Sequence, residues 1–321
     1  MLYFYQLILV MFKVMFKKIL LTVSVVGFMV LMIHLPFVLQ PSGSLVSPLS
    51  FTPRMALNLW FPKASATSQE DDLPEITAQA AYFVDTENGE VLYQKNSHQK
   101  LPIASLVKIM TAIVALENTS FDEEITVSPY AAGMEPDRMD LRQGEILAVE
   151  ELLYGMFLVS GNDASEALAE GVLGNRDEFI PAMNKKTLQL GMKDTLFINP
   201  SGLEEDDKEQ YSTAFDVALM SRYAIKQFPS LVEISSTYHR YIPKTSTHQD
   251  YDLYSGINLL TTYPGVLGLK TGYTPLAGLT LVTLARRQGQ QILGVLLNSQ
   301  DRRAEAKLLL DYSFAKLGAG N

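Results

Sequence analysis

The chain has 321 residues, of which 47% are hydrophobic, so it can bury a substantial core as one large domain or two smaller ones. It contains no cysteine, which excludes disulfides, thiolate metal sites and cysteine nucleophiles, and its four histidines are too scattered for a metal-ligand pattern. The net charge at pH 7 is −9, but residues 1–66 carry five basic and no acidic side chains, which leaves −14 for residues 67–321. This anionic part repels phosphate backbones, so we expect no nucleic-acid partner.

The N-terminal part of the chain has the features of a membrane anchor or an export signal. Residues 19–39 are almost wholly apolar, and at about 1.5 Å per residue they are long enough to cross a bilayer of about 30 Å. Lys13, Lys17 and Lys18 precede this run, which predicts a cytoplasmic N-terminus and an exported remainder. The small-x-small sequence at 64–66 lies too far beyond the run for the usual cleavage geometry, which favours a retained anchor.

Three regions are therefore predicted along the chain. Residues 1–40 form an N-terminal transmembrane anchor or signal segment. Residues 41–76 form a linker, because they contain scattered prolines and serines and no sustained period. Residues 77–321 form the globular domain. We expect a cell-membrane protein with this domain outside the cytoplasm, or an exported protein if the signal is cleaved.

The globular domain opens with two strand-forming runs, 81–85 and 90–93, which Asn88-Gly89 joins as a hairpin. Residues 105–117 follow with apolar side chains at helical spacing. Further helices are predicted over 149–159, 164–173, 177–190 and 213–226. After residue 264, β-branched runs predict adjacent antiparallel strands over 266–270, 279–285 and 292–297, and a closing amphipathic helix follows over 302–317.

Strands at both ends of a single domain must meet in one sheet. We therefore predict an α/β (α+β) fold in which an antiparallel sheet is flanked by helices, with a helical subdomain inserted between its strands. No Gly-x-Gly-x-x-Gly sequence or P-loop is present, so no nucleotide cofactor is expected. The chain also lacks the Gly-x-Ser-x-Gly sequence of an α/β-hydrolase.

The first chemical motif places a hydroxyl three residues before an amine. On a helix the side chains of Ser105 and Lys108 share one face, one turn apart, so the amine can take the hydroxyl proton. Lys108 can act as a base only if it is neutral part of the time, which burial and a second nearby cation favour. We predict Ser105 as the nucleophile, in the first turn of its helix, and Lys108 as the base.

The second motif, Ser160-Gly161-Asn162, follows a predicted helix and is expected to present a hydroxyl and a carboxamide from a loop. The Ser160 hydroxyl can relay a proton towards a leaving amine. The Asn162 carboxamide can orient Lys108 and the acyl chain by hydrogen bonding. We therefore count Ser160 and Asn162 among the catalytic residues.

The third motif, Lys270-Thr271-Gly272, combines a cation, a hydroxyl and a residue without a side chain. Lys270, held on a strand and charged, would lower the pKa of the base and bind a substrate carboxylate together with Thr271. Gly272 lets a substrate lie along the strand edge. The backbone N–H groups of Ser105 and Tyr273 are the predicted oxyanion hole.

The three motifs, in this order and at this wide spacing, resemble the signature of penicillin-binding proteins and class A β-lactamases. Longer stretches resemble the low-molecular-weight D-alanyl-D-alanine carboxypeptidases, which are the serine peptidases of family S11. The similarity runs over about residues 78–316. Its stretches are Pro102-Ile103-Ala104-Ser105 with Lys108, Ser160-Gly161-Asn162-Asp163-Ala164, Asn199-Pro200-Ser201-Gly202-Leu203, Tyr211-Ser212-Thr213-Ala214, and Gly268 to Thr274 with Ala277-Gly278.

The resemblance implies a DD-peptidase/β-lactamase-like fold and a two-step reaction. Ser105 would attack the penultimate D-alanine carbonyl of a peptidoglycan stem peptide, release the terminal D-alanine and form an acyl-enzyme that water hydrolyses. β-Lactams would acylate the same serine. By the family pattern, Arg302 would help to hold the terminal carboxylate, directly or through Thr271, although Arg303 is its neighbour. We expect no cofactor.

Three other functions stay open at this point. Many family members carry a second, β-rich domain and a C-terminal amphipathic anchor. We expect neither here, which leaves a DD-endopeptidase acting on cross-links as an alternative. A class A β-lactamase would need a Glu-x-x-Leu-Asn segment after the serine triplet, and none is present. A non-catalytic envelope sensor would be expected to have lost Ser105, Lys108 or Lys270, and all three are present.

Overall fold

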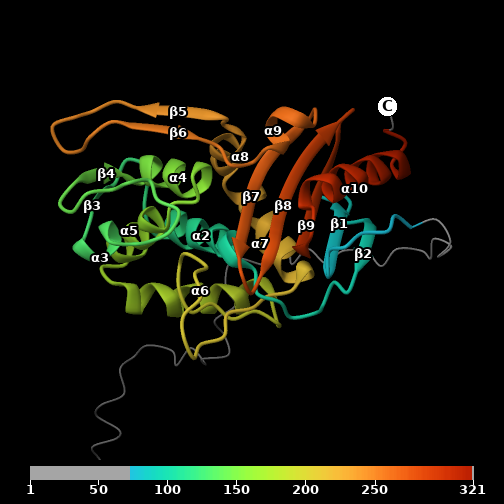
Figure 1. The fold of residues 1–321 in the computed structure, drawn as a ribbon, viewed down its shortest axis with the longest axis horizontal. Helices are drawn as coiled ribbons and strands as arrows, with labels where there is room; N and C mark the ends of the chain where they lie inside the picture. The colour runs from blue at the N-terminus through green and yellow to red at the C-terminus, as the bar shows by residue number, and fades with distance from the viewer. Residues whose placement is uncertain (1–72, 320–321) are drawn as a thin grey trace, which may run out of the picture. The chain divides into compact units, whose positions relative to one another are not determined.

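The computed structural model describes residues 73–319. Its main sheet has five antiparallel strands. Its strand order is β2-β1-β9-β8-β7. Since β1 pairs with both β2 and β9, strands from the two ends of the domain meet in one sheet, which confirms the predicted fold (Figure 1). The strands are β1 (Ala80–Asp85), β2 (Val91–Lys95), β7 (Val266–Thr274), β8 (Gly278–Arg287) and β9 (Gln290–Ser299).

Both faces of this sheet are covered, because its strands carry apolar side chains on both sides. In β1, Tyr82 belongs to one buried cluster and Phe83 to another, as expected for residues that alternate across a strand. The helix α10 (Arg302–Lys316) packs on the face of Phe83. On the opposite face, α2 (Lys108–Asn118) and α7 (Ala214–Gln227) contribute to the larger cluster.

The helical subdomain lies beside the sheet and is built around α2 (Figure 1). Most of α2 is buried, because its sequence is apolar almost throughout. The helices α4 (Val149–Leu158), α5 (Asn162–Val172) and α6 (Arg176–Leu190) pack against it. The subdomain also contains β3 (Glu124–Thr126), α3 (Pro129–Ala132) and β4 (Ile146–Ala148). The subdomain therefore meets the sheet at the N-terminal end of α2, where the predicted nucleophile lies.

Several small elements were missed by the sequence analysis: β3, β4, α3, α8 (Pro229–Ser236), α9 (Leu259–Thr262), and the hairpin of β5 (His239–Ile242) and β6 (Tyr251–Tyr254). They are short, and β5 is mostly exposed, so neither length nor periodicity marks them. Their pairing depends on partners distant in sequence, such as β4 for β3.

The predicted anchor, residues 1–40, and most of the predicted linker lie outside the described residues. Over residues 73–319, none of the helices combines the length and the apolar character required to span a bilayer.

Candidate active site

The chain turns sharply just before the predicted nucleophile. Ser105 lies in a short 3₁₀ helix, η3 (Ala104–Val107), that leads directly into α2, and Lys108 is the first residue of α2. Ala104 has a φ of 49°, which is a conformation that residues other than glycine rarely adopt. This arrangement places the Lys108 Nζ atom 3.0 Å from the Ser105 Oγ atom.

Three oxygen atoms surround the Lys108 amine, which is fully buried. Besides the Ser105 hydroxyl, Nζ donates to the Asn162 Oδ1 atom at 2.7 Å and to the Ser201 carbonyl at 2.6 Å. The latter two oxygens can only accept. When the amine is neutral, its two hydrogens satisfy these two acceptors, so its lone pair is left facing the Ser105 hydroxyl.

The electrostatic surroundings of Lys108 favour this neutral form. Burial and the positive charge of Lys270 lower the pKa of Lys108 well below its ordinary value. The carboxylates of Asp137, Glu166 and Asp163 oppose the shift without reversing it. Lys108 can therefore accept a proton at a pH at which an exposed lysine is fully protonated.

The second motif reaches the nucleophile from the junction between α4 and α5. The Ser160 hydroxyl lies 3.1 Å from the Ser105 Oγ atom, on a residue with a φ of 61°. Asn162 is not in a loop, as the sequence suggested, but is the first residue of α5. Its amide nitrogen donates to the Pro136 carbonyl, which leaves its oxygen facing Lys108.

The third motif lies in the middle of β7. Gly272 is in direct contact with the nucleophile, since a Cβ atom at this position would lie 2.9 Å from the Ser105 backbone nitrogen and 2.6 Å from the Thr280 Oγ1 atom. Only glycine permits so close an approach of the two segments. The backbone amide of Ser105 is therefore next to the strand along which a substrate is expected to lie.

Lys270 is buried, and its Nζ atom donates to the Thr271 carbonyl at 2.9 Å. Burial and the nearby Arg302 guanidinium lower the pKa of Lys270 to about 7. A bound carboxylate would raise the pKa of Lys270 again.

Arg302, at the start of α10, reaches both β7 and β8. Its Nη1 atom donates to the carbonyls of Gly272 at 2.6 Å and Thr280 at 3.2 Å. A cavity of 230 Å³ lies between Thr271, Arg302 and Arg303. The Tyr273 side chain is exposed, so the role predicted for this residue depends on its backbone N–H group alone.

The turn Asn199–Leu203 was noted in the sequence as part of the resemblance, but no role was predicted for it. It provides the Ser201 carbonyl that binds Lys108. Gly202 has a φ of 87° and lies against the Ala104 carbonyl, so this turn packs on the residue before the nucleophile. A backbone carbonyl has no sequence signature, which is why residue types alone did not reveal this contact.

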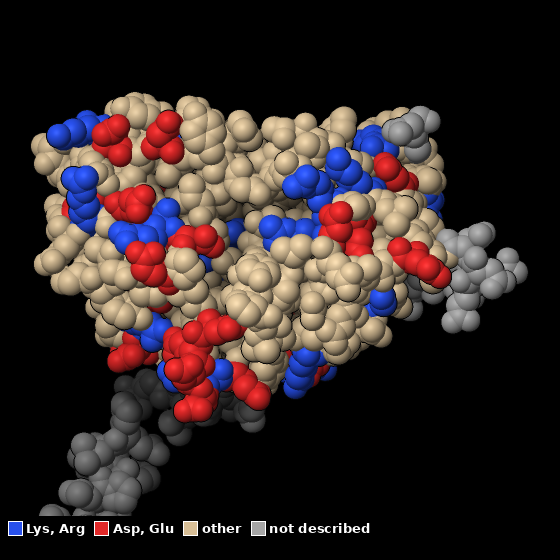
Figure 2. All heavy atoms as spheres, viewed as in Figure 1, with Lys and Arg blue, Asp and Glu red and all other residues tan. Residues whose placement is uncertain are grey.

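A larger cavity of 680 Å³ is lined by residues that include Ala104 and Thr274. The segment 203–210, which carries Glu204, Glu205, Asp206, Asp207 and Glu209, also lines this cavity. Figure 2 shows acidic side chains gathered at the lower edge of the molecule, where Figure 1 shows the loop that follows α6. No group of three or more carboxylate or histidine side chains in residues 73–319 is arranged to hold a metal ion.

Comparisons with known proteins show which family the chain resembles. Residues 64–301 match the family described as D-alanyl-D-alanine carboxypeptidase, peptidase S11. The D-alanyl-D-alanine carboxypeptidase DacF of Bacillus subtilis is 35% identical over 247 residues, which are 74% of this chain and 62% of that protein. DacA of Haemophilus influenzae is 34% identical over 258 residues, covering 75% of this chain and 63% of that protein. The chain thus spans somewhat less than two thirds of the length of these two curated relatives.

Solved structures show the same similarity. Penicillin-binding protein D2 from Listeria monocytogenes, in its cefotaxime-bound form, superimposes with a TM-score of 0.67 at 31% identity, covering 76% of this chain and 99% of that one. The D-alanyl-D-alanine carboxypeptidase DacD from Francisella tularensis gives a TM-score of 0.70 at 29% identity, covering 77% and 73% of the two chains.

Proposed function

The chain belongs to the D-alanyl-D-alanine carboxypeptidase family of peptidases, and we propose that it is a serine-type D-Ala-D-Ala carboxypeptidase that acts on peptidoglycan stem peptides. The observation that carries the proposal is the buried amine of Lys108, 3.0 Å from the Ser105 hydroxyl and held by two other acceptors. Lys108 is not an ordinary solvent-exposed lysine, because its side chain is fully buried and its pKa is lowered.

In the proposed acylation, the Ser105 Oγ atom attacks the carbonyl of the penultimate D-alanine while neutral Lys108 takes its proton. The oxyanion that forms lies between the backbone N–H groups of Ser105 and Tyr273. The C–N bond then breaks, and the leaving amine of the terminal D-alanine receives a proton by way of Ser160. The Ser160 hydroxyl is suited to this relay because it lies 3.1 Å from the Ser105 oxygen.

The terminal carboxylate of the substrate is proposed to lie between Lys270 and Thr271, with Arg302 contributing positive charge beside the strand. Water then attacks the ester, transfers a proton to Lys108 and restores the Ser105 hydroxyl. A β-lactam, which carries a carboxylate next to a strained amide, would acylate Ser105 by the same first step. The proposal places this domain outside the cytoplasmic membrane, attached through residues 1–40, which lie outside the described residues.

The direct test uses purified protein with a labelled penicillin and with a peptide ending in D-Ala-D-Ala. We expect one label per native chain, release of D-alanine from the peptide, and neither result with Ser105→Ala. Absence of both label and released D-alanine on the native protein would refute the proposal. Cleavage of cross-linked dimers without release from the linear peptide would instead indicate a DD-endopeptidase.

The pH dependence of the reaction should show two limbs. Activity rises with pH as Lys108 loses its proton, and kcat/KM for the peptide falls above about pH 7 as Lys270 loses its own in the free enzyme. Removal of a neighbouring positive charge raises the pKa of a lysine. Arg302→Gln should therefore move the falling limb to higher pH, and Arg302→Lys should leave it in place. An unmoved limb in Arg302→Gln would contradict this assignment.

A further inference from the structure

A buried ion pair lies behind the catalytic lysine. Glu166 follows Asn162 by one turn of α5, and its side chain is 1% exposed. Its Oε2 atom accepts from the Nε atom of Arg176 at 3.1 Å, while its Oε1 atom has no hydrogen-bond partner among the described residues. A buried pair of this kind contributes little net stability, because desolvation of both charges offsets their attraction.

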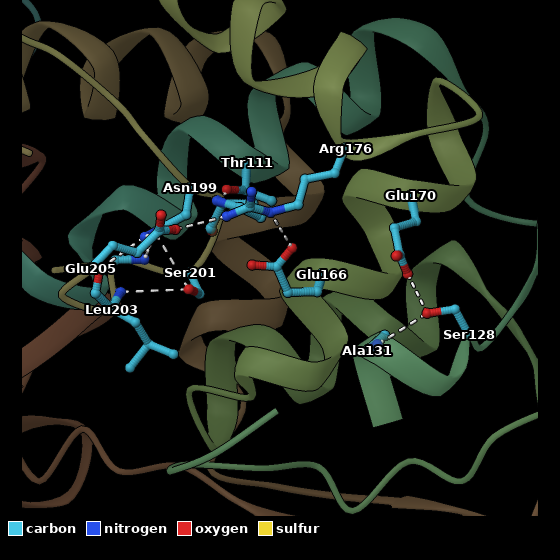
Figure 3. Close-up of polar contacts among 12 residues, drawn as sticks. Thr111, Ser128, Ala131, Glu166, Glu170, Arg176, Asn199, Ser201, Leu203 and Glu205 are labelled. Atoms are coloured by element: carbon cyan, nitrogen blue, oxygen red, sulfur yellow. Dashed lines mark hydrogen bonds and ion pairs between the residues drawn. The ribbon is translucent and has the colours of Figure 1, made fainter. Parts of the chain in front are cut away.

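Arg176 also reaches the turn that supports Lys108. Its Nη2 atom donates to the Glu205 Oε1 atom at 2.8 Å, and the same oxygen accepts from the Asn199 Nδ2 atom at 3.1 Å (Figure 3). Figure 3 shows the Arg176 side chain extending between Glu166 and this group. The Arg176 guanidinium thus links Glu166 of α5 to Glu205 in the acidic segment 203–210, and Glu205 in turn binds Asn199.

Asn199 closes the turn around the Ser201 carbonyl. Its Oδ1 atom accepts from the Gly202 backbone at 2.7 Å, and its Nδ2 atom donates to the Leu203 carbonyl at 2.8 Å. From the other side, the Thr111 hydroxyl of α2 donates to the Pro200 carbonyl at 2.6 Å. The turn is therefore held from α2 on one side and from Arg176 on the other.

We propose that Arg176 is a positioning residue for the base: anchored on Glu166, it fixes through Glu205 and Asn199 the turn whose Ser201 carbonyl orients Lys108. This inference rests on the proposed function, in which Lys108 deprotonates Ser105. The Ser201 carbonyl is one of the two acceptors that leave the lone pair of neutral Lys108 facing Ser105. A displaced carbonyl allows the amine to rotate, and a misplacement of about 1 Å at a reacting group can cost roughly 10²-fold in rate.

Arg176 also favours the charged form of Glu166, a carboxylate that acts on the base. The charged groups that act on Lys108 are Lys270 of β7 and the carboxylates of Asp137, Asp163 and Glu166. Burial raises the pKa of Glu166 to about 7, and Arg176 opposes this rise. Without Arg176 the pKa of Glu166 rises further, so Glu166 stays neutral to higher pH and no longer raises the pKa of Lys108.

The test compares Arg176→Ala with Lys186→Ala by measuring the rate of penicillin acylation as a function of pH. Lys186 is a matched control, because it lies on the same helix α6 and pairs with Glu117 of α2 without touching the turn. We expect Arg176→Ala to slow acylation by about tenfold or more and to move the rising limb to lower pH, because Glu166 then stays neutral. Lys186→Ala should leave both unchanged.

Two further variants separate positioning from charge. Glu205→Ala breaks the link to Asn199 but leaves the Glu166–Arg176 pair, so it should slow acylation without moving the limb. Glu205→Gln keeps an acceptor oxygen and should restore most of the rate. A native rate and profile in Arg176→Ala, or an equal loss in Lys186→Ala, would overturn the inference. Failure of the native protein to take up label would instead refute the proposed function, before any variant is compared.

Discussion

Lys108→Met is expected to slow acylation of Ser105 by about 10²–10⁴-fold, the usual contribution of a positioned base. Methionine fills similar space but cannot accept a proton, so the hydroxyl keeps its proton during the attack. Ser105 itself stays in η3, and slow labelling should still occur at this residue. The measurement is the rate of labelling by a fluorescent penicillin, followed until every chain has reacted.

The protein should remain folded in this variant. The substitution leaves the Asn162 and Ser201 oxygens without their donor, at a cost of about 1–3 kcal/mol for each acceptor, but it also removes an amine from a fully buried position. Lys226→Met is the control, since the Lys226 amine bonds Glu87 at the surface. A labelling rate within tenfold of native in Lys108→Met would show that another group takes the proton.

Gly202→Ala is expected to destabilise the fold and to disable the site at once. Gly202 has a φ of 87°, where an L-residue is strained by roughly 1–2 kcal/mol. A Cβ atom there would lie 2.1 Å from the Ala104 carbonyl oxygen, so backbone must move, and such overpacking costs about 1–3 kcal/mol. We expect a total loss of about 2–5 kcal/mol in the free energy of unfolding, together with a strong loss of acylation, because Ala104 precedes the nucleophile.

Gly174→Ala separates the two causes. Gly174 has nearly the same φ, 84°, but a Cβ atom there would have nothing within 4 Å. Its substitution should cost only the strain of about 1–2 kcal/mol and leave acylation at the native rate. Denaturant unfolding measures the first quantity and penicillin labelling the second. Equal losses of stability in Gly202→Ala and Gly174→Ala would mean that the turn at Gly202 moves to make room for the added methyl group at no cost.

The longer elements of the fold were predictable because each carries a local pattern. The hairpin of β1 and β2, the strands β7, β8 and β9, and the helices α4 to α7 and α10 agree with the predicted runs to within a few residues. The exception at the site is Asn162, which begins α5 where a loop was predicted. No side chain caps this helix, so the usual start signal is missing.

The order and spacing of the three motifs predicted the candidate residues but not the contacts between them. The distance of 3.0 Å between Lys108 and Ser105 follows from their separation by one helical turn, which the sequence contains. The contacts of Lys108 with Asn162 and Ser201 join residues 54 and 93 positions apart. No periodicity connects such positions, so only the packed chain brings them together.

By itself, then, the sequence determined which groups are available and in what order: a serine, an amine three residues on, a carboxamide, and a cation on a strand. The tertiary structure decided their chemical state. Lys108 is a base because packing removes water from its amine, sets Lys270 near it and turns two fixed acceptors towards it. A lysine in the same sequence motif but open to solvent would keep its proton at neutral pH, because water stabilises the charged form.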